Sequence, residues 1–184
     1  MKRLLPLALI SSLFFACSGS KSDDKAAAPT DSAVVAPAKV LPTEIADSKY
    51  SDIGKKSLEA LSSGNIDAYM SAFADNAVYV WNNGDSLAGK AAITAYWKKR
   101  RSEVIDSISF PNQIWLAVKV NEPQTPAHLP GIWALSWHAT LAKYKTGKHM
   151  MQWMHTDWHF DANDKIDRVI QFLDRVPINA ASKK

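Results

Sequence analysis

The spacing of the apolar residues changes near Pro111, and this change limits what the chain can fold into. Before it, apolar side chains recur at three- and four-residue steps, as on one side of a helix. After it, they recur at every second position, as on one side of a strand. Helices are predicted over residues 45–64, in a short segment after Asn65, and over 90–103, with a short strand at 77–81. Four longer strands are predicted at residues 114–120, 131–144, 148–160 and 165–174. This order predicts an α+β fold with helices on one face of an antiparallel sheet.

The first 17 residues have the pattern of a secretory signal. Two basic residues follow Met1, and the apolar stretch 4–15 is shorter than the roughly 20 residues that a membrane-spanning helix needs. The segment from Leu13 to Cys17 resembles the lipobox of bacterial lipoproteins, whose cysteine is acylated and becomes the new N-terminus. The resemblance implies that residues 1–16 are removed and that acyl chains such as palmitate on Cys17 anchor the protein in a membrane.

A linker is predicted between this anchor and the folded part. Residues 18–42 are rich in Ser, Asp, Lys, Ala and Pro and contain little to bury, so residues 17–44 are interpreted as the lipidated cysteine and a disordered linker. Ser18 follows the cysteine, where an Asp would resemble an inner-membrane retention signal. We therefore expect a lipid-anchored protein of the cell envelope, in the outer rather than the inner membrane.

The charge balance argues against nucleic acid as a partner. Removal of residues 1–16 leaves 20 of the 22 basic residues against 18 acidic ones, and the net charge becomes +2. Binding to phosphates needs several basic side chains together. The one basic cluster, Lys98 to Arg101, lies within the predicted helix 90–103 and is interpreted as a solvated face.

Four short motifs carry a resemblance to a known family: Ser63 to Asp67, Phe73 to Val78, Leu87 to Ile93, and Asp164 to Ile166. Their order resembles the SnoaL-like branch of the nuclear transport factor 2-like superfamily, over residues 45–176, with a C-terminal tail at 177–184. The resemblance implies a conical fold with three N-terminal helices packed in a curved antiparallel sheet, a pocket at its open end, and frequent dimerisation. The superfamily includes isomerases, cyclases, dehydratases, epoxide hydrolases and binding proteins without activity, so the fold does not fix the function.

The turns of the sheet predict which side chains share a face. A two- or four-residue loop around Thr146 and Gly147 would place His138 opposite His155, and a four-residue loop at 161–164 would place Arg168 opposite Asp157. A three- or five-residue loop would reverse part of this assignment. The mixed face is placed inside the cone: His138, Trp153, His155, Asp157, Arg168, Phe172 and Asp174. The apolar face is expected to be convex and covered by a second copy of the chain in a homodimer: Trp133, Leu135, Trp137, Met154, Thr156 and Trp158.

Asp174 or Asp157 is the predicted acid–base group, because a carboxylate in an apolar cavity has a raised pKa. In the resembling family an acidic residue near the end of the last strand often serves as the base. His155 would shuttle the proton. The predicted substrate-binding residues are Trp153, Phe172, His138, Arg168, Trp97 and Trp81.

Structural roles are the alternative for several of these residues. Asp157 and Arg168 would then form a cross-strand ion pair, His155 would be a core histidine, and Trp81 and Trp97 would belong to the core. A further alternative is that His138, His155 and Asp157 bind a metal ion through their nitrogen and oxygen atoms. We expect neither a metal nor a cofactor.

The leading hypothesis is an envelope lipoprotein whose SnoaL-like domain binds a small apolar or aromatic molecule. Its catalytic version adds acid–base chemistry of the isomerase, cyclase or dehydratase type, and its non-catalytic version is a binding module. The alternative is a dimerisation or scaffold domain at the cell envelope, with a filled pocket.

Overall fold

The computed structural model describes residues 39–123 and 129–183. The predicted signal segment 1–16, Cys17 and the linker up to residue 38 lie outside this part of the chain, so their predicted roles stay predictions. None of the helices in the described ranges is long and apolar enough to cross a membrane.

The helices lie where the apolar spacing predicts them, with three differences. The first is that Thr43–Ile45 form a short strand, β1, at the end of the predicted linker, so that the helix predicted from residue 45 begins only at Lys49. The predicted ones are α1 (Lys49–Ser63), α2 (Ile66–Ser71) and α3 (Lys90–Lys99). Gly64 ends α1 at a φ of 81°, and the Asn65 side chain caps α2 by accepting a bond from the Ala68 N–H at 3.0 Å. The third helix changes at Arg100 into a π-type turn, η1 (Arg100–Val104). A fourth α-helix, α4 (Arg175–Ser182), occupies most of the predicted tail. The described residues therefore form one more α-helix than the three that were predicted.

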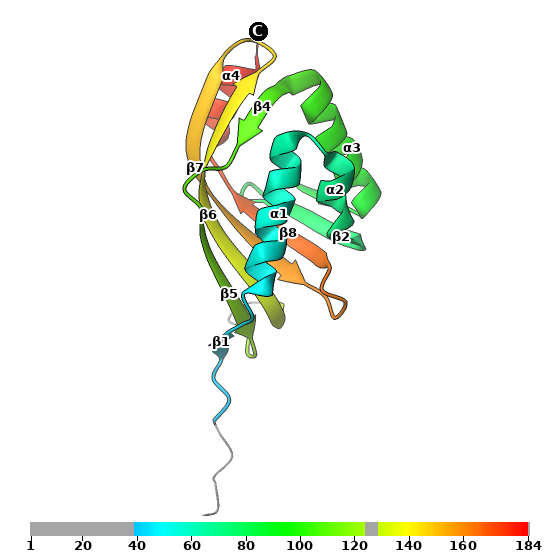
Figure 1. The fold of residues 1–184 in the computed structure, drawn as a ribbon, viewed down its shortest axis with the longest axis vertical. Coiled ribbons are helices and arrows are strands. Elements are labelled where there is room, and N and C mark those ends of the chain that lie inside the picture. The colour runs from blue at the N-terminus through cyan, green and yellow to red at the C-terminus, as the bar shows by residue number, and fades with distance from the viewer. Residues whose placement is uncertain (1–38, 124–128, 184) are drawn as a thin grey trace, which may run out of the picture. The chain divides into compact units, whose positions relative to one another are not determined.

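Eight strands form one sheet, in which helices α1 to α3 lie against one face (Figure 1). The strands are β1 (Thr43–Ile45), β2 (Phe73–Trp81), β3 (Ser86–Ala88), β4 (Ile105–Ser109), β5 (Ile114–Val120), β6 (Gly131–Tyr144), β7 (His149–Phe160) and β8 (Ile166–Phe172). Their order is β1-β5-β6-β7-β8-β2-β3, and β4 pairs with the C-terminal end of β6. The sheet is mixed rather than antiparallel, because β2 pairs with β8 in parallel.

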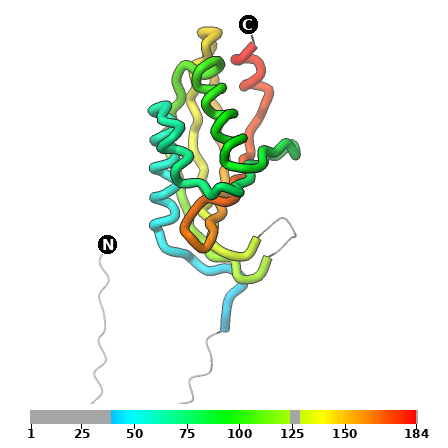
Figure 2. Tube along the Cα trace, turned by 90° about the vertical axis from the view of Figure 1, so that its right-hand side faces the viewer, coloured from blue at the N-terminus to red at the C-terminus, as the bar shows by residue number. Residues whose placement is uncertain are grey.

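The sheet curves around the helices and buries a core between them. We call the side facing the helices the inner face and the other side the outer face. The inner face and the helices contribute large, fully buried side chains such as Tyr69, Phe73, Ile93 and Trp158. The C-terminal helix α4 closes the end of the domain where α3 also ends (Figures 1 and 2). The space between the sheet, α3 and α4 is therefore enclosed from three sides.

The hairpin between β6 and β7 corrects the predicted register by one residue. His138 pairs with Met154, and Trp137 pairs with His155. The loop has three residues, 145–147, and its last residue, Gly147, has a φ of 84°. This is the three-residue hairpin in which a turn is followed by a left-handed residue. Because side chains alternate along a strand, a shift of one residue turns the side chains of β7 to the other face relative to β6.

The register between β7 and β8 differs from the prediction by two residues. A bulge between His159 and Phe160 sets Ile170, rather than Arg168, opposite Asp157. A shift of two residues leaves the faces unchanged. The predicted register, which sets Arg168 directly opposite Asp157, is therefore wrong.

Each predicted face is consequently divided. On the outer face lie Trp153, His155, Asp157, Arg168 and Phe172, together with Trp133, Leu135 and Trp137. On the inner face lie His138, Met154, Thr156 and Trp158.

Candidate functional site

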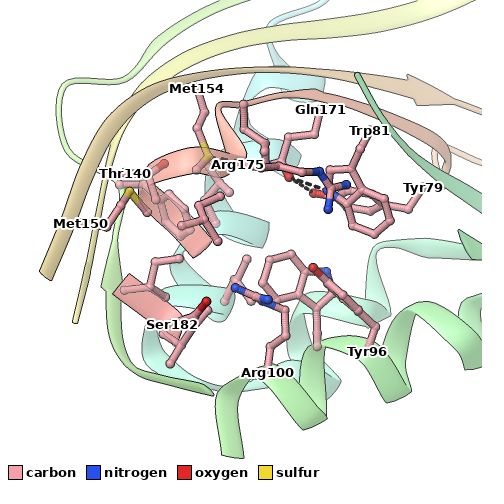
Figure 3. Close-up of a pocket in the computed structure, with 18 of the residues that line it drawn as sticks. Tyr79, Trp81, Tyr96, Arg100, Thr140, Met150, Met154, Gln171, Arg175 and Ser182 are labelled. Carbon is pink, nitrogen blue, oxygen red and sulfur yellow. Dashed lines mark hydrogen bonds between the residues drawn. The ribbon is translucent and has the colours of Figure 1, made fainter. Parts of the chain in front are cut away.

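A cavity of about 120 Å³ lies between the inner face of the sheet, α3, η1 and α4. Figure 3 shows side chains converging on it from all these elements. Most of its lining is aromatic or aliphatic, and Trp81 and Trp97, which the sequence assigned to the pocket, both line it. The cavity volume is close to that of an engineered 150 Å³ cavity that binds benzene in another protein. The space therefore suits a single aromatic ring.

Aromatic rings in mutual contact form one wall of the cavity. The Trp81 ring centroid lies 5.3 Å from that of Tyr96 and 4.8 Å from that of Tyr79, and Tyr96 lies 5.3 Å from Trp97 in an edge-to-face arrangement. Trp81 and Tyr79 come from β2, whereas Tyr96 and Trp97 come from α3. The wall thus depends on the packing of α3 against the sheet.

Gln171 fixes the orientation of this wall. Its Oε1 accepts a hydrogen bond from the Tyr79 hydroxyl at 2.9 Å and another from Trp81 Nε1 at 3.2 Å (Figure 3). Gln171 pairs with Trp81 across the parallel β2–β8 ladder. The Gln171 side chain is partly buried, and its oxygen has both of its acceptor positions filled, so the wall is held without a ligand.

Two arginines supply the positive charge of the cavity. The Arg100 guanidinium carbon lies 5.6 Å from the centroid of the Tyr96 ring, and that of Arg175 lies 5.6 Å from the centroid of the Trp81 ring. They reach the cavity from opposite sides, Arg100 from η1 and Arg175 from the start of α4 (Figure 3).

No acidic or imidazole side chain of the described residues lines the cavity, and neither does a cysteine. The titratable hydroxyls are those of tyrosines, and burial raises the pKa of Tyr79, Tyr96 and Tyr144. These hydroxyls are therefore protonated near neutral pH and act as hydrogen-bond donors. The cavity can bind an apolar ring and polar acceptor groups, but it lacks the carboxylate base that the sequence placed there.

The predicted acid–base residues lie on the outer face. His155 Nε2 is 2.7 Å from Asp157 Oδ1, and His155 Nδ1 is 3.1 Å from the Ser136 carbonyl oxygen. The His155 ring stacks on Trp137 at 4.6 Å between centroids and also contacts Phe172. The interior placement of these residues is wrong, because the three-residue hairpin turns them away from the helices.

Asp174 also lies outside the cavity, where it caps α4. Its carboxylate accepts a hydrogen bond from the Val176 N–H at 2.8 Å, and its side chain is exposed. Asp174, Trp153, His155 and Phe172 border a shallow hollow on the outer side. Trp153 is 54% exposed there and Phe172 is 44% exposed. Arg168 is on the same face of β8, and no contact brings it into the inner cavity.

His138 is the one member of the predicted mixed face that points inward. It is fully buried, its Nδ1 lies 3.1 Å from Thr140 Oγ1, and its ring contacts Phe110 edge-on at 5.2 Å. Burial lowers the pKa of His138 to about 4, so the imidazole is neutral at physiological pH. It does not line the cavity, and its role in the structure is that of a core histidine. Because His138 and the pair His155–Asp157 lie on opposite faces, they cannot share a metal ion. The described part of the chain contains no group of three or more His, Cys, Asp or Glu side chains placed to hold a metal ion.

Of the cavity lining, the sequence predicts only Trp81 and Trp97 as site residues. The residues that it misses include Tyr96, Arg100, Gln171 and Arg175. A signal existed for two of them, because Tyr96 and Arg100 are four residues apart on the helix face that also carries Ile93 and Trp97. The interpretation of the basic cluster as a solvated face is wrong for Arg100, which lines the cavity, and for Arg101, which is partly buried and donates to the Ile105 carbonyl oxygen at 3.4 Å. Gln171 and Arg175 depended on the register of β8 and on α4.

Comparisons with known proteins agree with this architecture. The SnoaL-like domain model matches residues 55–169, which is more than half of the chain. No curated protein matches the sequence. Among solved structures, a nuclear transport factor 2-like protein of unknown function from Burkholderia pseudomallei has a TM-score of 0.60 and 11% identity, covering 75% of this chain and 100% of that one. A candidate polyketide cyclase from Xanthomonas campestris has a TM-score of 0.59 and 13% identity, covering 73% and 97%. An epoxide hydrolase from M. tuberculosis has a TM-score of 0.54 and 12% identity, covering 73% and 90%. At these identities the likeness concerns the fold.

Proposed function

For this chain, which belongs to the SnoaL-like domain family, we propose that the function is to bind a small, largely apolar or aromatic molecule in the inner cavity. The observation that carries the proposal is the open volume of about 120 Å³ behind an aromatic wall that Gln171 holds in place. A scaffold domain would bury more apolar area by filling this space. The presence of an unfilled cavity therefore favours a ligand-binding role over a scaffold role.

The lining favours binding over acid–base catalysis. Isomerases and dehydratases that remove a proton next to a carbonyl need a base whose pKa lies near the working pH. The tyrosines of the cavity have raised pKa values, and a guanidinium group donates hydrogen bonds but offers no acceptor for a proton. We therefore propose the non-catalytic version of the hypothesis, in which this site recognises its ligand and leaves it unchanged.

A matched pair of variants tests the site. Met150 lines the cavity from the inner face of β7, whereas its neighbour Met151 is exposed on the outer face. Met150→Trp would fill the cavity, and Met151→Trp would add the same side chain outside it. We expect saturation-transfer NMR to show benzyl alcohol binding to the wild type and to Met151→Trp, but not to Met150→Trp. Thermal melting of each variant checks that it is folded. Equal binding by both variants, or no binding by the wild type, would contradict the proposal.

We also propose that the outer face mediates self-association. Seven large apolar side chains are exposed on β5 to β8: Ile114, Leu116, Trp137, Leu141, Met151, Trp153 and Phe172. The ladder places Ile114, Trp137, His155 and Phe172 in one row across the four strands. A continuous apolar surface of this kind is typical of a surface that is covered in the assembled protein. A second copy of the chain presents the same surface and can cover it symmetrically.

The location of the protein is proposed from the N-terminal segment. Acylation of Cys17 would hold the domain at the cell envelope, with the outer membrane favoured over the inner one by Ser18. The linker that follows would keep the ligand site in the aqueous space next to the lipid. This proposal is independent of the cavity and is tested separately.

A further inference from the structure

We propose that the ligand carries a carboxylate group that pairs with the guanidinium of Arg100. The inference rests on the proposed function, since the carboxylate belongs to the molecule that occupies the inner cavity. It adds a chemical class to that molecule: an aryl or arylalkyl carboxylate, whose ring packs on the aromatic wall.

The first support is the position of Arg100. The residue opens the π-type turn η1, and its carbonyl oxygen accepts a hydrogen bond from the Ile105 N–H. Its side chain is partly buried, lines the cavity and lies beside the Tyr96 ring. Arg100 thus leaves the solvated face on which Lys98 and Lys99 lie and faces the cavity instead.

The second support is the lack of a protein counter-ion. None of the ion pairs formed within residues 39–123 and 129–183 includes Arg100. The basic neighbour Lys98, by contrast, pairs with Asp67 at 2.7 Å. The Arg100 guanidinium forms side-chain hydrogen bonds with the neutral hydroxyls of Tyr96 and Tyr144. Neutral partners compensate a partly buried charge for its lost solvation less fully than an anion does. An anionic ligand would compensate for the lost solvation of the guanidinium by accepting two parallel N–H···O bonds. Arginine binds carboxylates in this two-bond geometry.

The third support is the electrostatic field of the whole cavity. The positive charges of Arg100 and Arg175 both oppose the rise in the pKa of Tyr96 that burial causes, so both act on the same region of the cavity. Arg175 is already engaged at the surface, where its Nη2 contacts Asn83 Oδ1 at 3.0 Å and Asp85 Oδ2 at 3.2 Å. Because no carboxylate of the described chain lines the cavity, the net field there is positive. Arg100 is the group left to bind the anion.

The shape of the cavity is compatible with this class of ligand. An aromatic ring fits a volume of about 120 Å³, and the Trp81–Tyr96 pair offers it an aromatic surface. Arg100 borders the same space, so a short linker between ring and carboxylate would allow both contacts. Phenylacetate has this composition, and phenylacetamide is its neutral counterpart of nearly the same shape.

The experiment compares these two probes by isothermal titration calorimetry on the folded domain. We expect the wild type to bind phenylacetate about tenfold or more tightly than phenylacetamide. The carboxylate offers the guanidinium two acceptor oxygens and an opposite charge, whereas the amide offers one neutral carbonyl oxygen. Arg100→Gln should abolish this preference and leave the affinity for phenylacetamide nearly unchanged. Lys99→Gln removes the same charge from the exposed neighbouring position and should keep the preference. Arg100→Lys, which retains the charge without the planar fork, should keep part of it.

The outcomes separate the two proposals. If phenylacetamide binds as tightly as phenylacetate to the wild type, the carboxylate inference is wrong while the cavity remains a ligand site. If both probes bind and Arg100→Gln preserves the preference, Arg100 is not the anion-binding residue. If neither probe nor benzyl alcohol binds, the proposed function fails and this inference fails with it. Melting curves of the variants show whether a loss of binding reflects unfolding.

Discussion

The buried His138 predicts a specific dependence of stability on pH. Its imidazole is fully buried between Phe110 and Thr140, and burial, with a smaller contribution from the charge of His155, lowers its pKa from 6.5 to about 4. Between these two values the unfolded chain binds a proton that the folded protein excludes. Stability therefore falls as the pH falls from 6.5 toward 4. At 1.36 kcal/mol for each unit of pKa difference, this group removes about 2 kcal/mol between pH 7 and pH 5, and about 3 kcal/mol by pH 4.

The assay measures the free energy of unfolding of the wild type and of His138→Leu at pH 7 and pH 5. Unfolding in urea is monitored by tryptophan fluorescence. The leucine variant should lose about 2 kcal/mol less than the wild type on acidification, whatever its stability at pH 7. His149→Leu is the matched control, because His149 is exposed next to the β6–β7 turn and its replacement should leave the pH dependence within about 0.5 kcal/mol of the wild type. An unchanged pH dependence in His138→Leu would refute the reasoning.

Four further predictions concern the hairpin, the wall, the outer face and the anchor. Gly147→Ala should destabilise the fold by about 1 kcal/mol in urea denaturation, because its φ of 84° strains an L-residue although the space around it is open; a neutral effect would contradict the three-residue loop. Tyr79→Phe removes the 2.9 Å hydrogen bond to Gln171 and should cost about 1 kcal/mol by the same measurement. Trp153→Glu should convert a dimer to a monomer in sedimentation velocity, and a wild type that is already monomeric would count against self-association through the outer face. Cys17→Ser should release the protein from membranes on cell fractionation, and continued membrane attachment would argue against acylation.

The apolar spacing predicted most elements of secondary structure. Strands β5 and β6 have the predicted bounds, and α1 ends at Gly64 as its position in the sequence indicates. The fourth helix was missed because it is short and has Pro177 in its first turn, although Asp174 precedes it as an N-cap. The parallel β2–β8 pairing was also missed, because strands far apart in the sequence carry no local signal of their direction.

The location of the site depended on one loop length that the sequence leaves open. A turn around Thr146 and Gly147 is evident from the residue types, but two, three or four loop residues are all compatible with them. The choice of three places His155 and Asp157 outside rather than inside the cone. The cavity residues Tyr96, Trp97 and Arg100 share one helix face by their spacing, and Arg100 keeps α-helical backbone geometry with its N–H bonded to the carbonyl oxygens of Tyr96 and Trp97. The apolar spacing therefore predicted the helices and strands, but the observed register was needed to assign each side chain to a face of the sheet.

The central claim is that ligands bind in the inner cavity and not in the hollow on the outer face. A crystal structure of the protein soaked with phenylacetate tests it most directly. The expected result is density for the ring between Trp81 and Met150, with the carboxylate at Arg100. Density confined to the outer hollow beside Trp153 and Asp174, or an inner cavity left empty at a saturating concentration, would contradict the claim.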